Sequence, residues 1–461
     1  MSEKASRIDL FTFRTVPMRA FHLTWMAFFV CFFAWFASAP LMPVLAREFA
    51  LTPGQVADIN IAAVAATILV RLIVGPLCDR YGPRRVYAAL MALGAIPVAA
   101  LACATGYTSV LLCRLGIGAV GASFVITQYH TSVMFAPKVV GTANAASAGW
   151  GNSGAGAAQA LMPMLLAALM ILGMHQASAW RVALLVPALA LLIMAAVYWR
   201  YTQDCPKGDF LALRKQGIAI DGEESGPHAA PEGLLPPGEA VLALGRPGGQ
   251  KSGWASFGAA CANYRVWMLF ITYGCCFGVE LFVHTVSATY YVNHFHLSLG
   301  NAGLAAGIFG LLALFARALG GILSDRTAKG GDLSWRAPLL AALLLGEGLG
   351  LMWFAHAQSA GMAIVAMVTF GLFTHMACGA TYALVPFIDR KALGGVAGIV
   401  GAGGNVGAVA AGFVMKGVGD VQQTVSILGA FVACSALCAL AVRLRATHLA
   451  ETSALAPAPM R

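Results

Sequence analysis

Long runs of apolar residues recur along the chain, and most are long enough to cross a lipid bilayer as a helix. A helix needs about 20 apolar residues to span ~30 Å of hydrocarbon. The pattern therefore predicts an all-α membrane protein with twelve transmembrane helices, in two sets of six. The first set lies near residues 22–45, 56–77, 86–104, 108–133, 143–172 and 180–200, and the second near 264–292, 300–323, 337–356, 360–386, 393–416 and 424–444.

The segment between the two sets has a different character. Residues 204–255 are rich in Pro and Gly, carry charges of both signs and lack a sustained apolar period. Such a composition is typical of a long, mobile linker. The expected organisation is an N-terminal tail (1–21), a six-helix half (22–200), a linker (201–262), a second six-helix half (263–444) and a C-terminal tail (445–461).

Composition supports lipid as the main solvent of the chain. Its 461 residues are 59% hydrophobic and 10% charged, whereas a soluble domain is roughly a quarter charged. The eleven cysteines are scattered along apolar stretches without a paired CxxC set, so no metal site is expected. The sequence also has no metal-spaced histidines, nucleophile elbow or cofactor motif. We therefore expect neither an enzyme nor a cofactor.

The net charge of +10 would suit a nucleic-acid partner, but its placement indicates membrane topology instead. With the N-terminus inside, all but six of the 29 Lys and Arg residues fall in cytoplasmic loops and tails. This positive-inside pattern places both termini in the cytoplasm, with the protein in the inner membrane. No nucleic-acid partner is expected. The six exceptions are Arg47, Arg181 and Lys416 outside, and Arg71, Arg114 and Arg317 within spans.

The two halves contain an internal repeat. Residues 71–80 and 317–326 both read R-x3-G-x3-D-R, at the end of the second helix of each half. In the fifth helix of each half, a lysine precedes an asparagine by fourteen residues, as Lys138 with Asn152 and Lys391 with Asn405. Both halves start on the same side, so the repeats are parallel. Such halves bind the substrate at their interface and rock about it. Because one chain supplies both halves, a monomer is expected to function.

Two arginines lie deep inside predicted spans. Arg71 and Arg317 each stand eight residues before an aspartate at the end of the span, which places them about 12 Å into the membrane. A charge there costs at least ~2.5–3.5 kcal/mol, and neither helix has an acidic residue at the matching depth. Two facing guanidinium groups can bind a small planar oxyanion through paired N–H donors. The alternative is that one arginine pairs with a carboxylate elsewhere and only packs the bundle.

Several motifs resemble those of a known transporter family. Residues 75–85 (GPLCDRYGPRR) resemble the loop motif of the major facilitator superfamily. Within it, residues 148–156 (AGWGNSGAG) and 401–409 (GAGGNVGAV) resemble the paired glycine-rich signatures of the nitrate/nitrite porter family. Residues 273–281 (YGCCFGVEL) and 179–187 (AWRVALLVP) resemble the nitrate-uptake branch of that family.

The resemblance implies alternating access with nitrate or nitrite as cargo. It implies that both arginines bind the anion, that two phenylalanine rings sandwich it, and that the glycine-rich helices line the pathway. Asparagine amides and a tyrosine hydroxyl would add donors, although close helix packing is a competing interpretation of the glycines. The substrate-binding residues expected are Arg71, Arg317, Asn152, Asn405, Tyr273, Phe124, Phe277, Gly151 and Gly404.

Further candidates concern coupling and gating. Glu280 and His284 are four residues apart and share a helix face, and a carboxylate inside a span often titrates. They form a candidate proton site, and a structural hydrogen bond from Glu280 is the alternative. The gating candidates, in the two copies of the loop motif, are Asp79, Arg80, Asp325 and Arg326.

Two modes of coupling follow from these residues. An empty site with two arginines carries excess positive charge and would reorient slowly, which favours nitrate/nitrite antiport. Proton symport needs a titratable group, which Glu280 provides, and the uptake-branch resemblance favours net nitrate import with protons. The remaining alternatives are a transporter of a different small anion and a membrane nitrate sensor that no longer transports. A sensor would need an output domain, and the linker shows no pattern of a folded domain.

Overall fold

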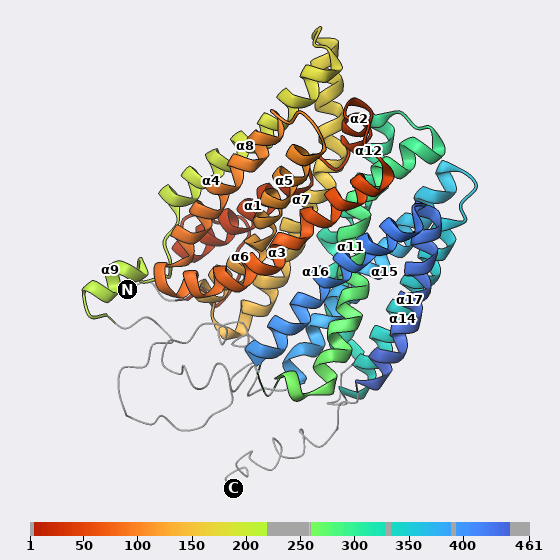
Figure 1. The fold of residues 1–461 in the computed structure, drawn as a ribbon. Coiled ribbons are helices and arrows are strands. Elements are labelled where there is room, and N and C mark those ends of the chain that lie inside the picture. Colours follow the sequence, from red (N-terminus) through yellow and green to blue (C-terminus); the bar gives the residue numbers. More distant parts are fainter. Residues whose placement is uncertain (1–3, 219–257, 259, 328–332, 389–392, 443–461) are drawn as a thin grey trace.

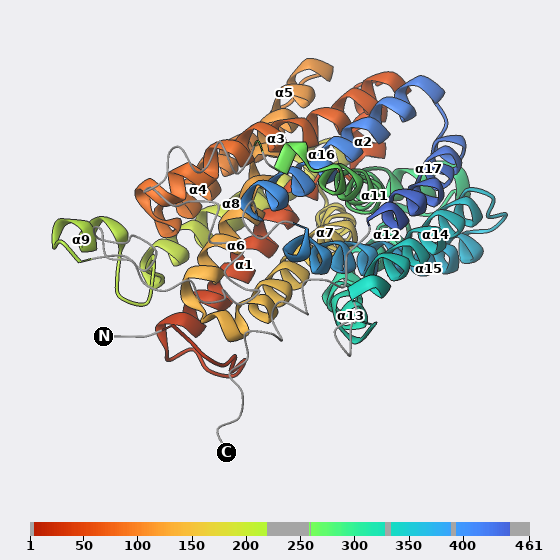
Figure 2. The same ribbon diagram turned by 90° about the horizontal axis from the view of Figure 1, so that it is seen from below.

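The computed structural model describes residues 4–218, 258, 260–327, 333–388 and 393–442. It confirms the all-α membrane architecture, with twelve helices in the described part long and apolar enough to span a bilayer. In Figure 1 the helices of the first half, red to yellow, lie on one side of the molecule, and those of the second half, green to blue, lie on the other. Figure 2 shows the same division from below.

Each half supplies six spans, and the spans Tyr107–Met134, Leu299–Thr327 and Leu333–Ala355 each combine shorter elements. In the first half the elements are α1 (Val16–Phe36), α2 (Met42–Glu48), α3 (Pro53–Tyr81), α4 (Pro83–Leu101), α5 (Tyr107–Gly118), η1 (Ala119–Ala122), α6 (Ser123–Met134), α7 (Pro137–Ile171) and α8 (Gln176–Tyr201). In the second half they are α11 (Tyr264–Phe295), α12 (Leu299–Leu311), α13 (Ala313–Thr327), η3 (Leu333–Trp335), α14 (Arg336–Ala355), α15 (Ala360–Leu384), η4 (Val385–Phe387), α16 (Leu393–Val418) and α17 (Val421–Ala441).

The fourth span of the first half is interrupted by the 3₁₀ turn η1. The interruption follows a close approach to α3, where a Cβ on Gly118 would lie 2.7 Å from the backbone oxygen of Ala63. Thr67 on α3 also donates a hydrogen bond to the Gly118 carbonyl at 2.6 Å. Because a 3₁₀ turn changes the pattern of carbonyl acceptors, the Gly121 carbonyl can accept a hydrogen bond from Arg71.

The helices pack in the same way in both halves, which gives the sequence repeat a structural counterpart. α1 packs on α7 as α11 packs on α16, and α4 packs on α8 as α14 packs on α17. The close contacts depend on glycine: a Cβ on Gly154 of α7 would collide with the Phe29 carbonyl, and one on Gly407 of α16 would collide with the Gly274 carbonyl. Small residues therefore set the spacing of these helix pairs.

The contacts described between the halves lie towards one side of the bundle. We call the side that holds residues 202–218 the linker side and the opposite side the far side. On the far side Lys416 Nζ lies 2.7 Å from Asp58 Oδ1, and α7 packs on α12 with Gly156 against Gly307. One helical turn nearer the far side than Gly156, the Gln159 amide donates to the His284 carbonyl. In this conformation the two halves are joined on the far side.

The first part of the expected linker is folded. Residues 202–218, which we call the clip, include the short helix α9 (Phe210–Lys215) and pack against the first half. Phe210 and Leu213 are buried in a small cluster with Val133. Asp204 accepts hydrogen bonds from the backbone N–H groups of Arg84 and Phe210, both at 2.9 Å. A six-residue helix is too short to show an apolar period, which explains why the pattern did not reveal it.

We expect the substitution Asp204→Asn to remove a pH dependence of stability. Burial raises the pKa of Asp204 from 3.8 to about 6. Because the folded pKa lies above the ordinary value, the stability contributed by the protonated form is lost as the pH rises through about 6. The free energy of unfolding of the wild type should fall, relative to the variant, by about 1 kcal/mol between pH 5 and pH 7.5. Thermal unfolding of both purified proteins measures this difference, and a difference that does not change with pH would contradict the prediction.

Candidate functional site

The two arginines predicted to bind an anion each lie over an aromatic ring. The guanidinium of Arg71 on α3 lies over the Phe124 ring, 5.6 Å from its centroid. The guanidinium of Arg317 on α13 lies over the Phe277 ring, 5.3 Å from its centroid. In both arginines Nε is buried without a hydrogen-bond partner among the described residues. Each half therefore presents a cation above an aromatic ring, with donor capacity to spare.

A pair of tyrosines connects the two arginines. Tyr273 on α11 is stacked on Phe277 with centroids 5.2 Å apart, and its ring meets that of Tyr382 on α15 edge to face at 5.0 Å. Tyr382 interacts electrostatically with both Arg71 and Arg317. The surroundings of the two arginines therefore include Tyr273, which the sequence suggested as a site residue, and Tyr382, which it did not. No spacing or motif distinguishes Tyr382, because it reaches the site from a different helix.

The two glycines named as site residues make room for aromatic rings. A Cβ on Gly151 would collide with the Phe28 ring of α1, and a Cβ on Gly404 would collide with the Phe277 ring of α11. Both rings belong to the first helix of their half, so the glycine-rich helix meets an aromatic side chain of that helix in each half.

Asn152 and Asn405 are buried amides with no partner. They are 1% and 0% exposed, and both amide atoms of each side chain lack a hydrogen bond within the described part of the chain. An unsatisfied buried polar atom costs about 1–3 kcal/mol, so such groups need an explanation. Both follow directly on the glycines beneath the aromatic rings. Among the described residues, both amides therefore keep hydrogen-bonding capacity that a polar ligand could use.

Glu280 provides the carboxylate that was not found in the helices of the arginines. Its Oε2 accepts a hydrogen bond from Arg317 Nη2 at 2.5 Å, so one arginine of the pair is neutralised from α11. Within the described residues Arg71 has no such ion pair; its Nη2 donates to the Gly121 carbonyl at 3.5 Å. The alternative interpretation of the arginines, pairing with a carboxylate elsewhere, thus applies to Arg317 in this conformation.

The imidazole beside Glu280 belongs to His375 on α15. His375 Nδ1 lies 3.4 Å from Glu280 Oε2. His284, which the sequence suggested as the partner, has its ring between those of Phe36 and Phe309, with centroids 5.1 and 5.2 Å away. His375 is a second residue that the sequence did not reveal.

The gating candidates do not meet one another in this conformation. Asp325 pairs with Arg336 of its own half, with Arg336 Nη2 2.8 Å from Asp325 Oδ1. Arg80 and Arg326 are exposed, and the Arg80 guanidinium lies over the Tyr81 ring, 5.1 Å from its centroid. The side chain of Asp79 lies outside the described part of the structure. Their gating role remains a prediction for a state closed on the linker side.

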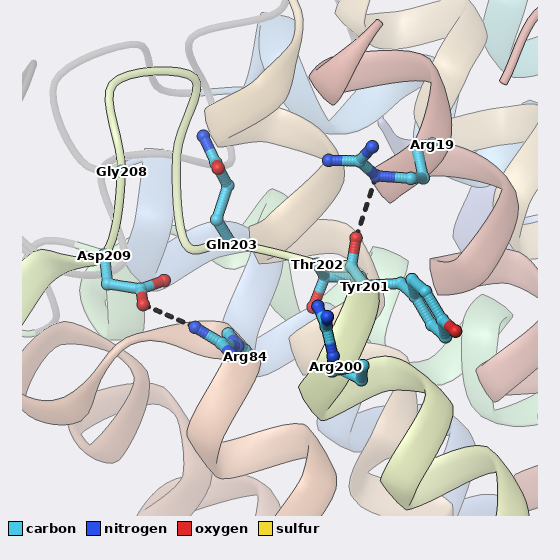
Figure 3. A pocket seen from close by; sticks show the side chains of 8 residues that line it. All are labelled: Arg19, Arg84, Arg200, Tyr201, Thr202, Gln203, Gly208 and Asp209. Carbon is cyan, nitrogen blue, oxygen red and sulfur yellow. Dashed lines mark hydrogen bonds and ion pairs between the residues drawn. The ribbon is translucent and has the colours of Figure 1, made fainter. Parts of the chain in front are cut away.

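A basic pocket on the linker side is separate from this site. It has a volume of about 320 Å³ and is lined by three arginines, among other residues. Figure 3 shows how the clip contributes to it: Arg84 Nη1 pairs with Asp209 Oδ2 at 2.5 Å, and Arg19 Nε donates to the Tyr201 carbonyl at 2.9 Å. The first contact holds the clip against α4, and the second joins α1 to the end of α8, immediately before the clip.

Comparisons with known proteins agree on the kind of molecule. Residues 24–412 match the family described as Major Facilitator Superfamily. High affinity nitrate transporter 2.5 of Arabidopsis thaliana is 36% identical, with 94% of this chain and 81% of the relative covered. Nitrate transporter 2.2 of Chlamydomonas reinhardtii is 35% identical, with coverage of 88% and 74%. Nitrate/nitrite transporter NrtP of Nostoc punctiforme is 29% identical, with 85% of each chain covered.

Solved structures share the fold at low sequence identity. A bacterial homologue of the human lysosomal transporter Spinster, in an inward-facing and unoccupied conformation, superposes with a TM-score of 0.67 at 14% identity, covering 96% of this chain and all of the other. The proton:xylose symporter XylE superposes with a TM-score of 0.62 at 14% identity, with 92% and 94% covered. These likenesses concern the arrangement of helices alone.

Proposed function

This chain belongs to the nitrate/nitrite porter family of the major facilitator superfamily, and on that basis we propose that it carries nitrate across a membrane by alternating access. It is a transporter and not an enzyme. Several relatives are named as nitrate transporters and others as nitrate/nitrite transporters. We propose nitrate as the main cargo and nitrite as a second one, because both are small planar anions.

The observation that carries the proposal is the convergence of both arginines on one aromatic cluster. Arg71 and Arg317 approach the Tyr273–Tyr382 pair from opposite halves. A guanidinium presents coplanar N–H donors that match the coplanar oxygens of nitrate. The rings of Phe124 and Phe277, which lie beneath the two guanidiniums, would flank the planar anion.

The buried amides of Asn152 and Asn405 complete the proposed binding site. Each can donate a hydrogen bond to an oxygen of the anion, which would satisfy donors that have no partner among the described residues. Because one asparagine and one arginine come from each half, the anion would be held between the halves. Their relative rotation would then expose it to one side of the membrane or the other.

The present conformation supports a specific orientation of the transport cycle. Contacts between the halves join the far side and continue inward along α7 as far as Gly149 against Ala313, which supports a conformation closed on the far side. We propose that the linker side faces the cytoplasm, with both termini there and the protein in the inner membrane, following the positive-inside distribution. The conformation would then be inward-facing. All parts of the proposed site come from one chain, which suits a monomeric transporter.

Proton symport is the coupling that we favour, with nitrate/nitrite exchange as the second candidate. Glu280 supplies a titratable carboxylate beside Arg317, as symport requires. Arg71, which has no ion pair among the described residues, favours exchange, since an empty site with excess positive charge would reorient slowly. In both schemes the arginines hold the anion. The schemes differ in how the carrier returns: without an anion in symport, and loaded with nitrite in exchange.

Uptake of labelled nitrate into proteoliposomes tests the function and separates the two schemes. We would compare an inward proton gradient with no gradient, and vesicles preloaded with nitrite with empty vesicles. Accumulation driven by the proton gradient in empty vesicles is expected. Uptake only into nitrite-loaded vesicles would replace symport by exchange. No nitrate movement under either condition, with the protein folded, would refute nitrate transport.

A further inference from the structure

A single carboxylate oxygen in the second half has three partners. Glu280 is 1% exposed, and its Oε2 accepts a hydrogen bond from Arg317 Nη2 at 2.5 Å. The same oxygen lies 3.4 Å from Nδ1 of His375 and 3.7 Å from Sγ of Cys378, both on α15. An arginine that the proposed nitrate site requires is thus bound to a carboxylate in this structure.

The histidine beside this carboxylate has a defined tautomer when it is neutral. His375 Nε2 lies 3.0 Å from the backbone oxygen of Phe309, and because a carbonyl oxygen only accepts, Nε2 must carry the hydrogen. Nδ1 therefore turns a lone pair towards Glu280 Oε2, and within the described structure it has no hydrogen-bond partner. Two acceptors face each other at 3.4 Å, which leaves a place for one proton between them.

Other titratable groups surround the pair. His284 lies one helical turn further along α11 and interacts electrostatically with Glu280. Glu347 on α14 is 0% exposed and also interacts with Glu280, while Tyr273 on α11 interacts with Arg317. Of the histidines, only His375 directs a ring nitrogen at the carboxylate within the ion-pair distances described. The geometry therefore singles out His375 as the group that can share a proton with Glu280.

We propose that nitrate displaces Glu280 from Arg317, and that the released carboxylate takes up one proton, which it shares with Nδ1 of His375. This proposal rests on the proposed function, because it requires nitrate to bind at Arg317. The Arg317–Glu280 ion pair is exchanged for an Arg317–nitrate pair, and the proton comes from the solution that supplies the nitrate. A buried carboxylate that has lost its cation favours protonation, so anion binding and proton uptake occur together.

The exchange keeps the charge of the site constant. Before nitrate binds, two guanidinium groups and one carboxylate sum to a single positive charge. After binding, nitrate carries the negative charge and the carboxylate is neutral, so the sum is unchanged. The empty carrier then meets no greater electrostatic barrier than the loaded carrier. This removes the electrostatic reason for obligatory exchange with nitrite.

Nitrate titration of the purified full-length protein in weakly buffered detergent solution tests the proposal. A pH indicator should report about one proton taken up per nitrate bound, and the apparent Kd should rise about tenfold per pH unit across the coupled range, because the two ligands are reciprocally linked. Nitrate binding to the wild type without proton uptake would overturn the proposal but leave the proposed function intact. Failure of the folded wild type to bind nitrate would instead refute the proposed function.

Substitutions of Glu280, His375 and His284 test which side chains hold the proton that is taken up with nitrate. Glu280→Gln should bind nitrate with a Kd that does not change with pH and with no proton uptake, whereas proton uptake at the wild-type level would overturn the proposal. His375→Gln should keep nitrate binding at low pH but shift the coupled range down by about one pH unit or more, because Glu280 must hold the proton alone. His284→Gln should keep the wild-type coupling. Loss of coupling in His284→Gln, with none in His375→Gln, would overturn the assignment of His375.

Discussion

Replacing Arg71 by lysine is expected to lower nitrate affinity and uptake about a hundredfold, while leaving the protein folded. Lysine keeps the positive charge but loses the planar fork of donors. Loss of a paired, charge-assisted hydrogen-bond interaction is worth about 3 kcal/mol, or about a hundredfold in affinity. Arg71 has no carboxylate partner in the described structure, so its substitution should affect anion binding more than stability. Uptake and thermal unfolding of the same preparation measure both quantities.

A matched substitution gives the control. Arg181 lies on the far side and pairs with Glu48 at 2.7 Å, so Arg181→Lys should transport nitrate at close to the wild-type rate. Arg317→Lys should lose nitrate uptake like Arg71→Lys, but it should also lower the unfolding temperature, because Arg317 binds the buried carboxylate of Glu280. Wild-type uptake in Arg71→Lys would mean that the first half does not hold the anion through its arginine.

Adding one methyl group at Gly154 or Gly407 is expected to destabilise the protein by about 1–3 kcal/mol. A Cβ at either position would collide with a backbone carbonyl of the neighbouring helix, at Phe29 or Gly274. Backbone atoms cannot move aside as a flexible side chain can, so the helix pair must separate. We expect lower unfolding temperatures for Gly154→Ala and Gly407→Ala, with a matching loss of transport.

Each of these glycines has a control in its own helix. Gly141 in α7 and Gly398 in α16 have open space where a Cβ would be placed. Gly141→Ala and Gly398→Ala should leave the unfolding temperature unchanged or raise it slightly, since alanine favours the helix. Equal effects at all four positions would show that helix propensity, and not the close approach of helices, decides the outcome.

Sequence reasoning predicted the parts of the site that lie within single helices. The depth of Arg71 and Arg317 followed from helical rise, and the repeat placed them in equivalent positions. Phe124 and Phe277 were named from a resemblance, and their rings lie beneath the two guanidiniums. Such features depend on spacing along one helix, which a linear pattern records.

The parts that could not be predicted depend on contacts between helices. His375 and Tyr382 reach the centre from α15, and no periodicity in α15 indicates that it faces Glu280 or the arginines. The ion pair between Arg317 and Glu280 joins α13 to α11 for the same reason. The helix α9 was missed on different grounds, because its six residues are held by hydrogen bonds to Asp204 and not by an apolar stripe.

The carboxylate of Glu280, which pairs with Arg317 in this structure, also has a consequence for the membrane voltage. An interior potential of −100 mV opposes the entry of a lone anion by about 2.3 kcal/mol. When one proton enters with each nitrate, no net charge crosses, and the voltage no longer limits accumulation. On the proposal above, the pH difference alone then sets how far nitrate can be concentrated, so a cell with a strongly negative interior can still fill itself with an anion.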